Sequence, residues 1–566
     1  MKSEPARSLR IHAISKRVTN GALAALIGLC FFLVAVVAIR DQSPSNLLSP
    51  RYLLNSVPTA LSFLLGRPHD YAAYREVANG FWPEEQSSPV RVDKLIKETM
   101  ATPVREPDEL WFYQGDDKGL ADIVYVGFRL FGLHSNSIYY AELLLLGLST
   151  ALAVLFCRAD TRFLLILLFY FISLYAILFT FEISVESNSL IEPRFIGYLS
   201  IPSMLFFVFA SLNREPLRVA YVLCSVAQAF VLLMIIHARS SELWQMVAVS
   251  AVALMCSVSP IFNRDWKMLG RTLFPVLMLV IAYCGLAQYK SYMYNDQYFA
   301  IYHSSRIVWH NALMGLAFND DLGPKYHIAK PNSAAIADDF QVITGVGHFI
   351  AQRDEMDAAQ SLLGEYLRFS KMDTNTFNWI LYERYARALY FKIVTDDFWQ
   401  VARTYLEIMP SVLVDVIRFM ATANATSAHH IIVYGPLEIP KRYDRDLYLN
   451  PFRGPVLLSL FVIALLIFLS RWWNVRLFLF SRRHICAILL CTAFAAIPPL
   501  LTVPYIQYAQ LFILILLMWG YIVLTSLMYF FLGRYPLART GARASPKPFE
   551  AFAALALQPK RPPGPP

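Results

Sequence analysis

A succession of long hydrophobic runs constrains this chain more than any other feature of its sequence. Residues 21–39 (GALAALIGLCFFLVAVVAI) carry no charge, and about 20 apolar residues are enough to cross the hydrocarbon core of a bilayer. Charged residues make up 16% of the chain, against roughly 25% in soluble domains. The sequence therefore predicts an all-α fold, a polytopic bundle of about ten transmembrane helices. The expected spans are 21–39, 138–157, 163–182, 195–212, 218–237, 244–262, 272–289, 455–470, 484–503 and 506–531.

The first run could also be the core of a secretory signal peptide. It is longer than a usual signal core, and Arg40-Asp41-Gln42 makes a poor cleavage site. We therefore interpret residues 21–39 as a retained first span.

Positive charge is distributed unequally between the connectors. Lys and Arg gather in 1–20, 158–162, 213–218, 263–271, 471–483 and the tail from 533, whereas the alternate short connectors contain Arg194, Arg239 and little else. The positive-inside rule then predicts that both termini are cytoplasmic. Because the basic residues follow the span ends, the net charge of +9 does not indicate nucleic-acid binding.

Two long polar segments, 40–137 and 290–454, are therefore predicted to share the extracytoplasmic face. The first follows span 1, and the second is large enough for a mainly helical domain between a membrane domain at 21–289 and three C-terminal spans at 455–532. Asp397 is expected to cap a helix from Phe398 to Met409 that Pro410 interrupts. Residues 411–421 are too short and charged to span and predict an interfacial helix, and the Pro-rich tail at 533–566 predicts disorder.

Carboxylates concentrate in the first outer segment. Asp116, Asp117 and Asp122 flank Lys118 in the stretch 115–122 (GDDKGLAD), which leads into an amphipathic segment, and Asp70 follows a predicted turn. Such side chains can accept a proton or hold a divalent ion. The alternatives are that Asp70 only caps a helix and that Asp116 and Asp117 form a solvated turn.

Other polar stretches lie at predicted outer span ends. His237 and Arg239 begin the segment 237–245 (HARSSELWQ), which could bind a lipid phosphate or be a hairpin anchored by Trp244. Arg194 lies with Glu186 and Glu192 between two spans. In the large outer segment, His310 could be a base or ligand, although a lone His beside Trp is more often a structural hydrogen-bonding group.

Several classes of chemistry are not supported by the sequence. All seven cysteines lie in or beside apolar runs, so neither a disulfide framework nor a zinc site is indicated. The chain has no Gly-rich phosphate loop, His-Glu-x-x-His motif or Gly-x-Ser-x-Gly elbow. Without an ATP signature, any transfer reaction would need a pre-activated donor.

Residues 68–81 (PHDYAAYREVANGF) and 119–140, with FRLFG at 128–132, resemble two recurring features of GT-C type membrane glycosyltransferases. In that superfamily an aspartate after span 1 precedes a short helix, and an apolar helix ending in Leu-Phe-Gly precedes span 2. In overall layout the chain resembles an uncharacterised group of bacterial multi-pass membrane proteins, and this resemblance implies the inner (plasma) membrane of a bacterium.

The resemblance implies transfer of a sugar from a polyprenyl-phosphate donor to a cell-envelope glycan or lipid. It implies Asp70 as the catalytic base, with Asp116 and Asp117 as a second acidic site that holds a divalent metal (Mg²⁺ or Mn²⁺) or the donor. Gln507 stands where the superfamily often has a phosphate-binding Arg, so His237, Arg239, Arg194 and His310 become the candidate substrate-binding residues. The alternatives are a polysaccharide polymerase, a lipid-linked sugar transporter and a non-catalytic envelope scaffold.

Overall fold

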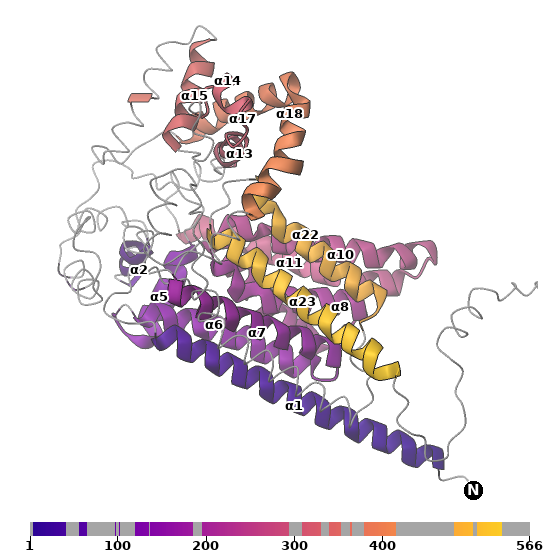
Figure 1. The fold of residues 1–566 in the computed structure, drawn as a ribbon. Coiled ribbons are helices and arrows are strands. Elements are labelled where there is room, and N and C mark those ends of the chain that lie inside the picture. Colours follow the sequence, from indigo (N-terminus) through magenta and orange to yellow (C-terminus); the bar gives the residue numbers. More distant parts are fainter. Residues whose placement is uncertain are drawn as a thin grey trace, which may run out of the picture.

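The structure is a computed structural model in which every described element is a helix (Figure 1). This confirms the predicted all-α fold over the described part of the chain. The residues that the structure describes are 4–40, 56–64, 97, 101, 119–134, 136–184, 195–293, 308–329, 339–352, 363–364, 379–414, 480–501 and 506–534.

Eight helices, taken over the described residues, are long and apolar enough to cross a membrane. The protein is thus a polytopic transmembrane bundle, as predicted. The ninth expected span is included as α22, the tenth corresponds to α23, whose described apolar part is Leu511–Leu527, and the expected span at 455–470 lies outside the described residues. The helices of the bundle are α1 (Glu4–Arg40), α6 (Asn136–Cys157), α7 (Thr161–Ser184), η2 with α8 (Ile196–Ser200, Ile201–Asn213), α9 (Val219–Ala238), η3 with α10 (Ser240–Glu242, Leu243–Phe262), α11 (Trp266–Met293), α22 (Arg482–Leu501) and α23 (Ile506–Arg534).

Helices α7 and α8 form the centre of this bundle, and α1 lies along α7 in the same direction. The Thr161 hydroxyl donates a hydrogen bond to Asn20 over 2.8 Å, and farther along Phe31 packs edge-on against Phe171. Because α1 and α7 run parallel, their starts lie at one end of the bundle (Figure 1).

The same end gathers the predicted cytoplasmic connectors. Asn213, at the end of α8, donates to Asp160 before α7, and Arg214 contacts Met268 near the start of α11. Described basic residues at this end, called the basic rim, are Lys16, Arg17, Arg158, Arg162, Arg214, Arg218, Arg264, Lys267, Arg271, Arg482 and Arg483. The connectors 158–162, 213–218 and 263–271 therefore lie at one end of the bundle, and the side of the membrane that this end faces stays a prediction.

A second group of helices packs around its own apolar cluster beyond the spans (Figure 1). Leu313, Ile343, Tyr382 and Leu389 are at the centre of this cluster and are almost fully buried. The described helices are α13 (Trp309–Leu316), α14 (Leu322–Lys325), α15 (Asp339–Ala351), α17 (Trp379–Asp396), α18 (Phe398–Arg403) and the π-turn η4 (Thr404–Ile408). We call this group the outer domain. Its predicted start at 290 falls within α11, which continues to Met293, whereas its predicted end at 454 lies outside the described residues and stays a prediction.

The helix that begins at Phe398 continues past Pro410 to Val414, so the expected interruption at Pro410 is wrong. A proline inside an α-helix lacks an N–H and clashes with the carbonyl four residues earlier. Here the preceding turn widens into the π-turn η4, and the N–H of Met409 bonds to the carbonyl of Thr404, five residues back. The helix accommodates Pro410 by this local change of pitch.

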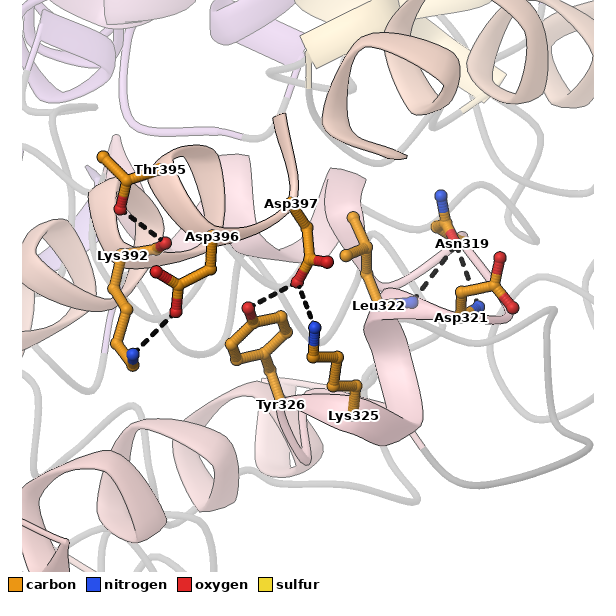
Figure 2. A network of polar contacts seen from close by, with 9 residues as sticks. All are labelled: Asn319, Asp321, Leu322, Lys325, Tyr326, Lys392, Thr395, Asp396 and Asp397. Carbon is orange, nitrogen blue, oxygen red and sulfur yellow. Dashed lines mark hydrogen bonds and ion pairs between the residues drawn. The ribbon is translucent and has the colours of Figure 1, made fainter. Parts of the chain in front are cut away.

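Asp397 occupies the position before α18, as predicted, but its side chain does not cap that helix. The carboxylate instead accepts hydrogen bonds from Lys325 Nζ at 2.6 Å and Tyr326 Oη at 2.5 Å (Figure 2). These partners hold the pKa of Asp397 below its usual range. Asp397 therefore joins α14 to the junction of α17 and α18.

Replacing Asp397 with Asn should loosen this junction, because Asn carries no charge to pair with Lys325. We expect hydrogen exchange of the amides at 322–326 to accelerate roughly two- to fivefold, the size expected of a partly exposed ion pair. The control is Asp396→Asn, since Asp396 pairs with Lys392 on the same helix (Figure 2). Equal effects of the two variants would contradict the assignment.

Acid should have the same effect on the unchanged protein. A carboxyl whose pKa is lowered by folding contributes stability above its unfolded pKa of about 3.9, and this contribution is lost as the pH falls through the folded value. Below pH about 4, exchange at 322–326, corrected for the intrinsic rate, should therefore approach that of the Asp397→Asn variant.

Candidate functional site

Two polar stretches that the sequence analysis singled out meet at the end of the bundle opposite the basic rim. His237, at the end of α9, places Nε2 3.2 Å from the Oδ2 atom of Asp122. Tyr289, near the end of α11, donates its hydroxyl to Asp122 Oδ1 over 2.9 Å. Asp122 and His237 are 4% and 1% exposed. The structure thus brings the described part of GDDKGLAD, residues 119–122, to the start of HARSSELWQ through a buried carboxylate–imidazole pair.

Helix α5 (Gly119–Phe131) carries Asp122 into this position. Its 13 residues are too few to span, and it packs on α2 (Val57–Leu64), α6 and α9. Apolar residues such as Leu120, Ile123 and Val124 form its buried face, which confirms the expected amphipathic segment. Asp122 points away from Leu120 and Val124 and is buried as well, because residues 119–124 at the start of α5 are buried on every side.

A glycine sets the separation of α5 and α9. A Cβ on Gly119 would overlap the backbone nitrogen of Ala238 and the backbone carbon of His237. The backbone of α5 can therefore approach the end of α9 only because residue 119 has no side chain. This close approach places Asp122, one turn later, beside the imidazole.

A second buried carboxylate lies three residues beyond Arg239. Glu242 is fully buried, and its Oε2 accepts hydrogen bonds from Trp244 Nε1 at 2.9 Å and Gln245 Nε2 at 3.0 Å. Gln245 Nε2 also donates to the carbonyl of Gly197 over 3.0 Å. A Cβ on Gly197 would overlap the Glu242 carboxylate. Trp244, expected as a membrane-interface anchor, is 4% exposed and is therefore a hydrogen-bond donor inside the bundle.

A third buried carboxylate, Glu142 on α6, was not singled out in the sequence analysis. It is 1% exposed, and the hydroxyl of Tyr198 donates to its Oε2 over 3.4 Å. Tyr198 is held in turn by Tyr170, which donates to the Tyr198 carbonyl over 2.7 Å. The signal for Glu142 was available, because it is the only charged residue in the apolar run 138–157 and ionisable residues inside spans are expensive to bury.

These groups make up what we call the outer-end cluster, defined as Asp122, Glu142, Tyr198, His237, Arg239, Glu242, Gln245 and Tyr289. Buried carboxylates need hydrogen-bond donors or cations, because an uncompensated charge costs several kcal/mol. Tyr, Trp and Gln donors supply this compensation here. The carboxylate–imidazole pair can also move a proton, since the carboxylate orients the imidazole and stabilises its charged form.

The other candidate residues lie in three places: in this cluster, in the outer domain, or outside the described residues. Arg239 is half-buried and connects α9 to η3. His310 instead lies in the outer domain, 3% exposed, with Nδ1 2.6 Å from the Tyr382 hydroxyl. Asp70, Asp116, Asp117 and Arg194 lie outside the described residues, so their roles stay predictions.

A metal site is not formed by the described residues. No three His, Cys, Asp or Glu side chains of this part of the chain come together as a metal ion would need. The predicted ligands Asp116 and Asp117 lie outside it, so the expected divalent metal stays a prediction.

Comparison with known proteins returns no relative: no protein-family model, curated protein or solved structure matches the chain. The resemblance to GT-C glycosyltransferases therefore remains a prediction.

Replacing Gly119 with Ala should separate α5 from α9, because the new methyl group would meet backbone rather than a movable side chain. Overpacking of this kind costs about 1–3 kcal/mol. We expect a lower midpoint of thermal unfolding in detergent, measured by fluorescence-detected size exclusion. The matched control is Gly270→Ala on α11, where a Cβ has open space. If both variants have the same midpoint of thermal unfolding as the parent protein, the predicted clash at residue 119 is wrong.

The position of His310 depends on Glu383, whose carboxylate accepts the peptide N–H groups of Val308, Trp309 and His310 over 3.0–3.2 Å. Burial raises the pKa of Glu383, and these N–H groups act in the opposite direction. Glu383 thus caps α13 from α17.

Replacing Glu383 with Gln should turn an amide NH₂ toward one or more of these donors. Leaving buried donors unpaired costs about 1–3 kcal/mol, so hydrogen exchange at 311–316 should accelerate roughly five- to a hundredfold. Glu407→Gln is the control, because Glu407 is exposed and pairs only with Arg403 among the ion pairs of the described residues. Unchanged exchange in Glu383→Gln would show that α13 does not depend on this cap.

Proposed function

We propose that the protein is a membrane glycosyltransferase that moves a sugar from a polyprenyl-phosphate donor to a cell-envelope glycan or lipid. The observation that carries the proposal is the contact between Asp122 and His237. It joins the acidic stretch of the first outer segment to the stretch expected to bind a lipid phosphate.

The position of this contact supports a reaction on the outer face. The basic rim lies at the other end of the spans, and Lys and Arg favour the cytoplasmic side of a membrane. In this proposal both termini are cytoplasmic, the protein lies in a bacterial inner membrane, and the outer-end cluster faces the extracytoplasmic side. Lipid-linked donors and acceptors can reach that level by diffusing in the bilayer.

The reaction needs a base and a group that neutralises the leaving phosphate. The acceptor oxygen attacks the anomeric carbon, the bond from that carbon to the phosphate oxygen breaks, and the phosphate leaves with the electron pair. The hydroxyl proton passes to a carboxylate or imidazole. In the proposal Asp122 and His237 hold and move this proton, while Arg239 stabilises the charge of the phosphate.

Asp70, Asp116 and Asp117 retain the roles that the resemblance implies, as base and as donor- or metal-binding residues. In the sequence, Asp116 and Asp117 lie three and two residues before Gly119, the residue that packs against α9. In the proposal Asp70 takes the proton from the acceptor hydroxyl, Asp122 and His237 then hold and move that proton, and Asp116 and Asp117 bind the donor or a metal, so these roles do not replace the acid–base pair.

One observation favours a second function, a lipid-linked sugar transporter. Glu142 and Glu242 are fully enclosed in the bundle, and buried carboxylates inside membrane spans often belong to proton or substrate pathways. A transporter would depend on these two residues and not on Asp122, which lies on the shorter helix α5. A non-catalytic scaffold would depend on none of the three.

The test is transfer by the purified full-length protein in proteoliposomes supplied with a panel of polyprenyl-phosphate sugars and a cell-envelope lipid extract as acceptor. Asp122→Asn and His237→Gln should each lower the rate about 100-fold or more, the usual effect of losing an acid–base group. The matched controls are Asp160→Asn and His484→Gln, which change the same residue types at the basic rim. They should keep the parent rate.

The alternatives give different outcomes. Unchanged transfer by folded Asp122→Asn would show that the pair is not catalytic. Movement of the intact lipid-linked sugar between leaflets, without transfer and lost in Glu142→Gln or Glu242→Gln, would identify a transporter. Neither transfer nor movement, with normal folding, would favour the scaffold.

A further inference from the structure

The helix over residues 398–414 exposes an unusual number of large apolar side chains for a segment outside the spans. Trp399 is 80% exposed and Leu406 is 81% exposed, with Phe398 at 57% and Val414 at 46%. Trp399 and Leu406 are seven residues apart, about two helical turns, so they lie near one face. In a water-exposed domain such a stripe needs a partner.

The opposite side of the same helix joins the outer domain to the bundle. Val401 is buried in the apolar cluster of the outer domain, whereas Leu413 is buried in the apolar cluster of the spans. Figure 1 shows this helix, in orange from α18 onward, descending from the outer domain to the spans near α22. Its C-terminal end therefore lies at the level of the membrane-spanning helices, and its exposed stripe is continuous with their outer end.

The charge on this helix suits a bilayer surface. Arg403 and Glu407 are the only charged residues between 398 and 414, and they pair with each other, Nε to Oε2, at 3.3 Å. The exposed surface is thus apolar and aromatic, and its two charged side chains pair with each other, so it carries no net charge. Trp side chains are enriched at the boundary between lipid and water, where an apolar ring and a polar N–H both find partners.

Distances along the helix are compatible with this placement. Leu406 lies seven residues before Leu413, a rise of about 10 Å, and the headgroup region of each leaflet is roughly 5–8 Å thick. Even a helix standing upright would keep Leu406 close to the headgroups. A helix inclined toward the membrane plane brings Trp399 to the same level.

We propose that Phe398, Trp399, Leu406 and Val414 insert into the headgroup region of the outer leaflet and hold the outer domain against the bilayer. This interfacial helix begins 13 residues earlier than the one expected at 411–421. A second attachment comes from α13, which packs against α22. The lipid contact concerns the placement of the outer domain, and it holds whether or not the outer-end cluster transfers sugars.

The test places single spin labels on the full-length protein in lipid nanodiscs, in a background without its seven cysteines. Labels replace Trp399 and Leu406, and matched control labels replace Lys392 and Glu407, which are polar and exposed in the same domain. Collision rates with oxygen, which concentrates in lipid, and with a water-soluble nickel chelate give the depth of each label.

At positions 399 and 406 we expect oxygen collisions to exceed nickel collisions, whereas the control positions should show the reverse. The proposal is overturned if labels at 399 and 406 collide with the nickel chelate as often as the controls do. It is also overturned if they are shielded from both reagents, because burial against a second protein copy would then cover the stripe. Hydrogen exchange at 379–401 establishes that each labelled variant keeps its fold.

Discussion

The contact of α5 with the end of α9 is the constraint on which the outer end of this bundle depends. Gly119 has no side chain, so the two backbones can touch, and Asp122 reaches His237 and Tyr289. Without that approach, the carboxylate would be buried without its partners, which is costly in an apolar interior. The absence of a Cβ at residue 119 therefore lets the buried carboxylate reach its partners, and this contact links the short helix α5 to the spans α9 and α11.

The two ends of the bundle carry charge differently because burying a charged group in an apolar interior costs free energy. At the basic rim, Arg and Lys lie at helix ends and in short turns, where water can solvate them. At the outer end, Asp122, Glu142 and Glu242 are enclosed by tyrosine, tryptophan and glutamine donors. Solvated charge orients the protein in the membrane, whereas enclosed charge is retained because hydrogen bonds compensate its burial.

Sequence patterns predicted the all-α fold, the succession of spans and the amphipathic helix α5, because each depends on residues close together in the chain. The site itself required contacts over long separations: Asp122 and Tyr289 are 167 residues apart, and periodicity shows which face of a helix is buried but not which helix covers it. Asp397 illustrates the same limit. Its place before α18 predicts a helix cap, but its carboxylate instead accepts hydrogen bonds from Lys325 and Tyr326, which lie far away in the sequence. Glu142 is different, because its burial inside an apolar run could have been anticipated from the sequence.

The depth of the buried carboxylates bears on what the outer end can do. Glu142 lies six residues after the start of α6, roughly 9 Å along the helix axis, whereas Asp122 belongs to a helix that does not span. An acid–base pair at the boundary suits a reaction between a lipid-linked donor and an acceptor that both arrive at the membrane surface. A carboxylate one to two turns deeper suits a group that holds a proton or stabilises the bundle. The proposed function therefore assigns chemistry to Asp122 and His237 and a structural or proton-binding role to the deeper Glu142.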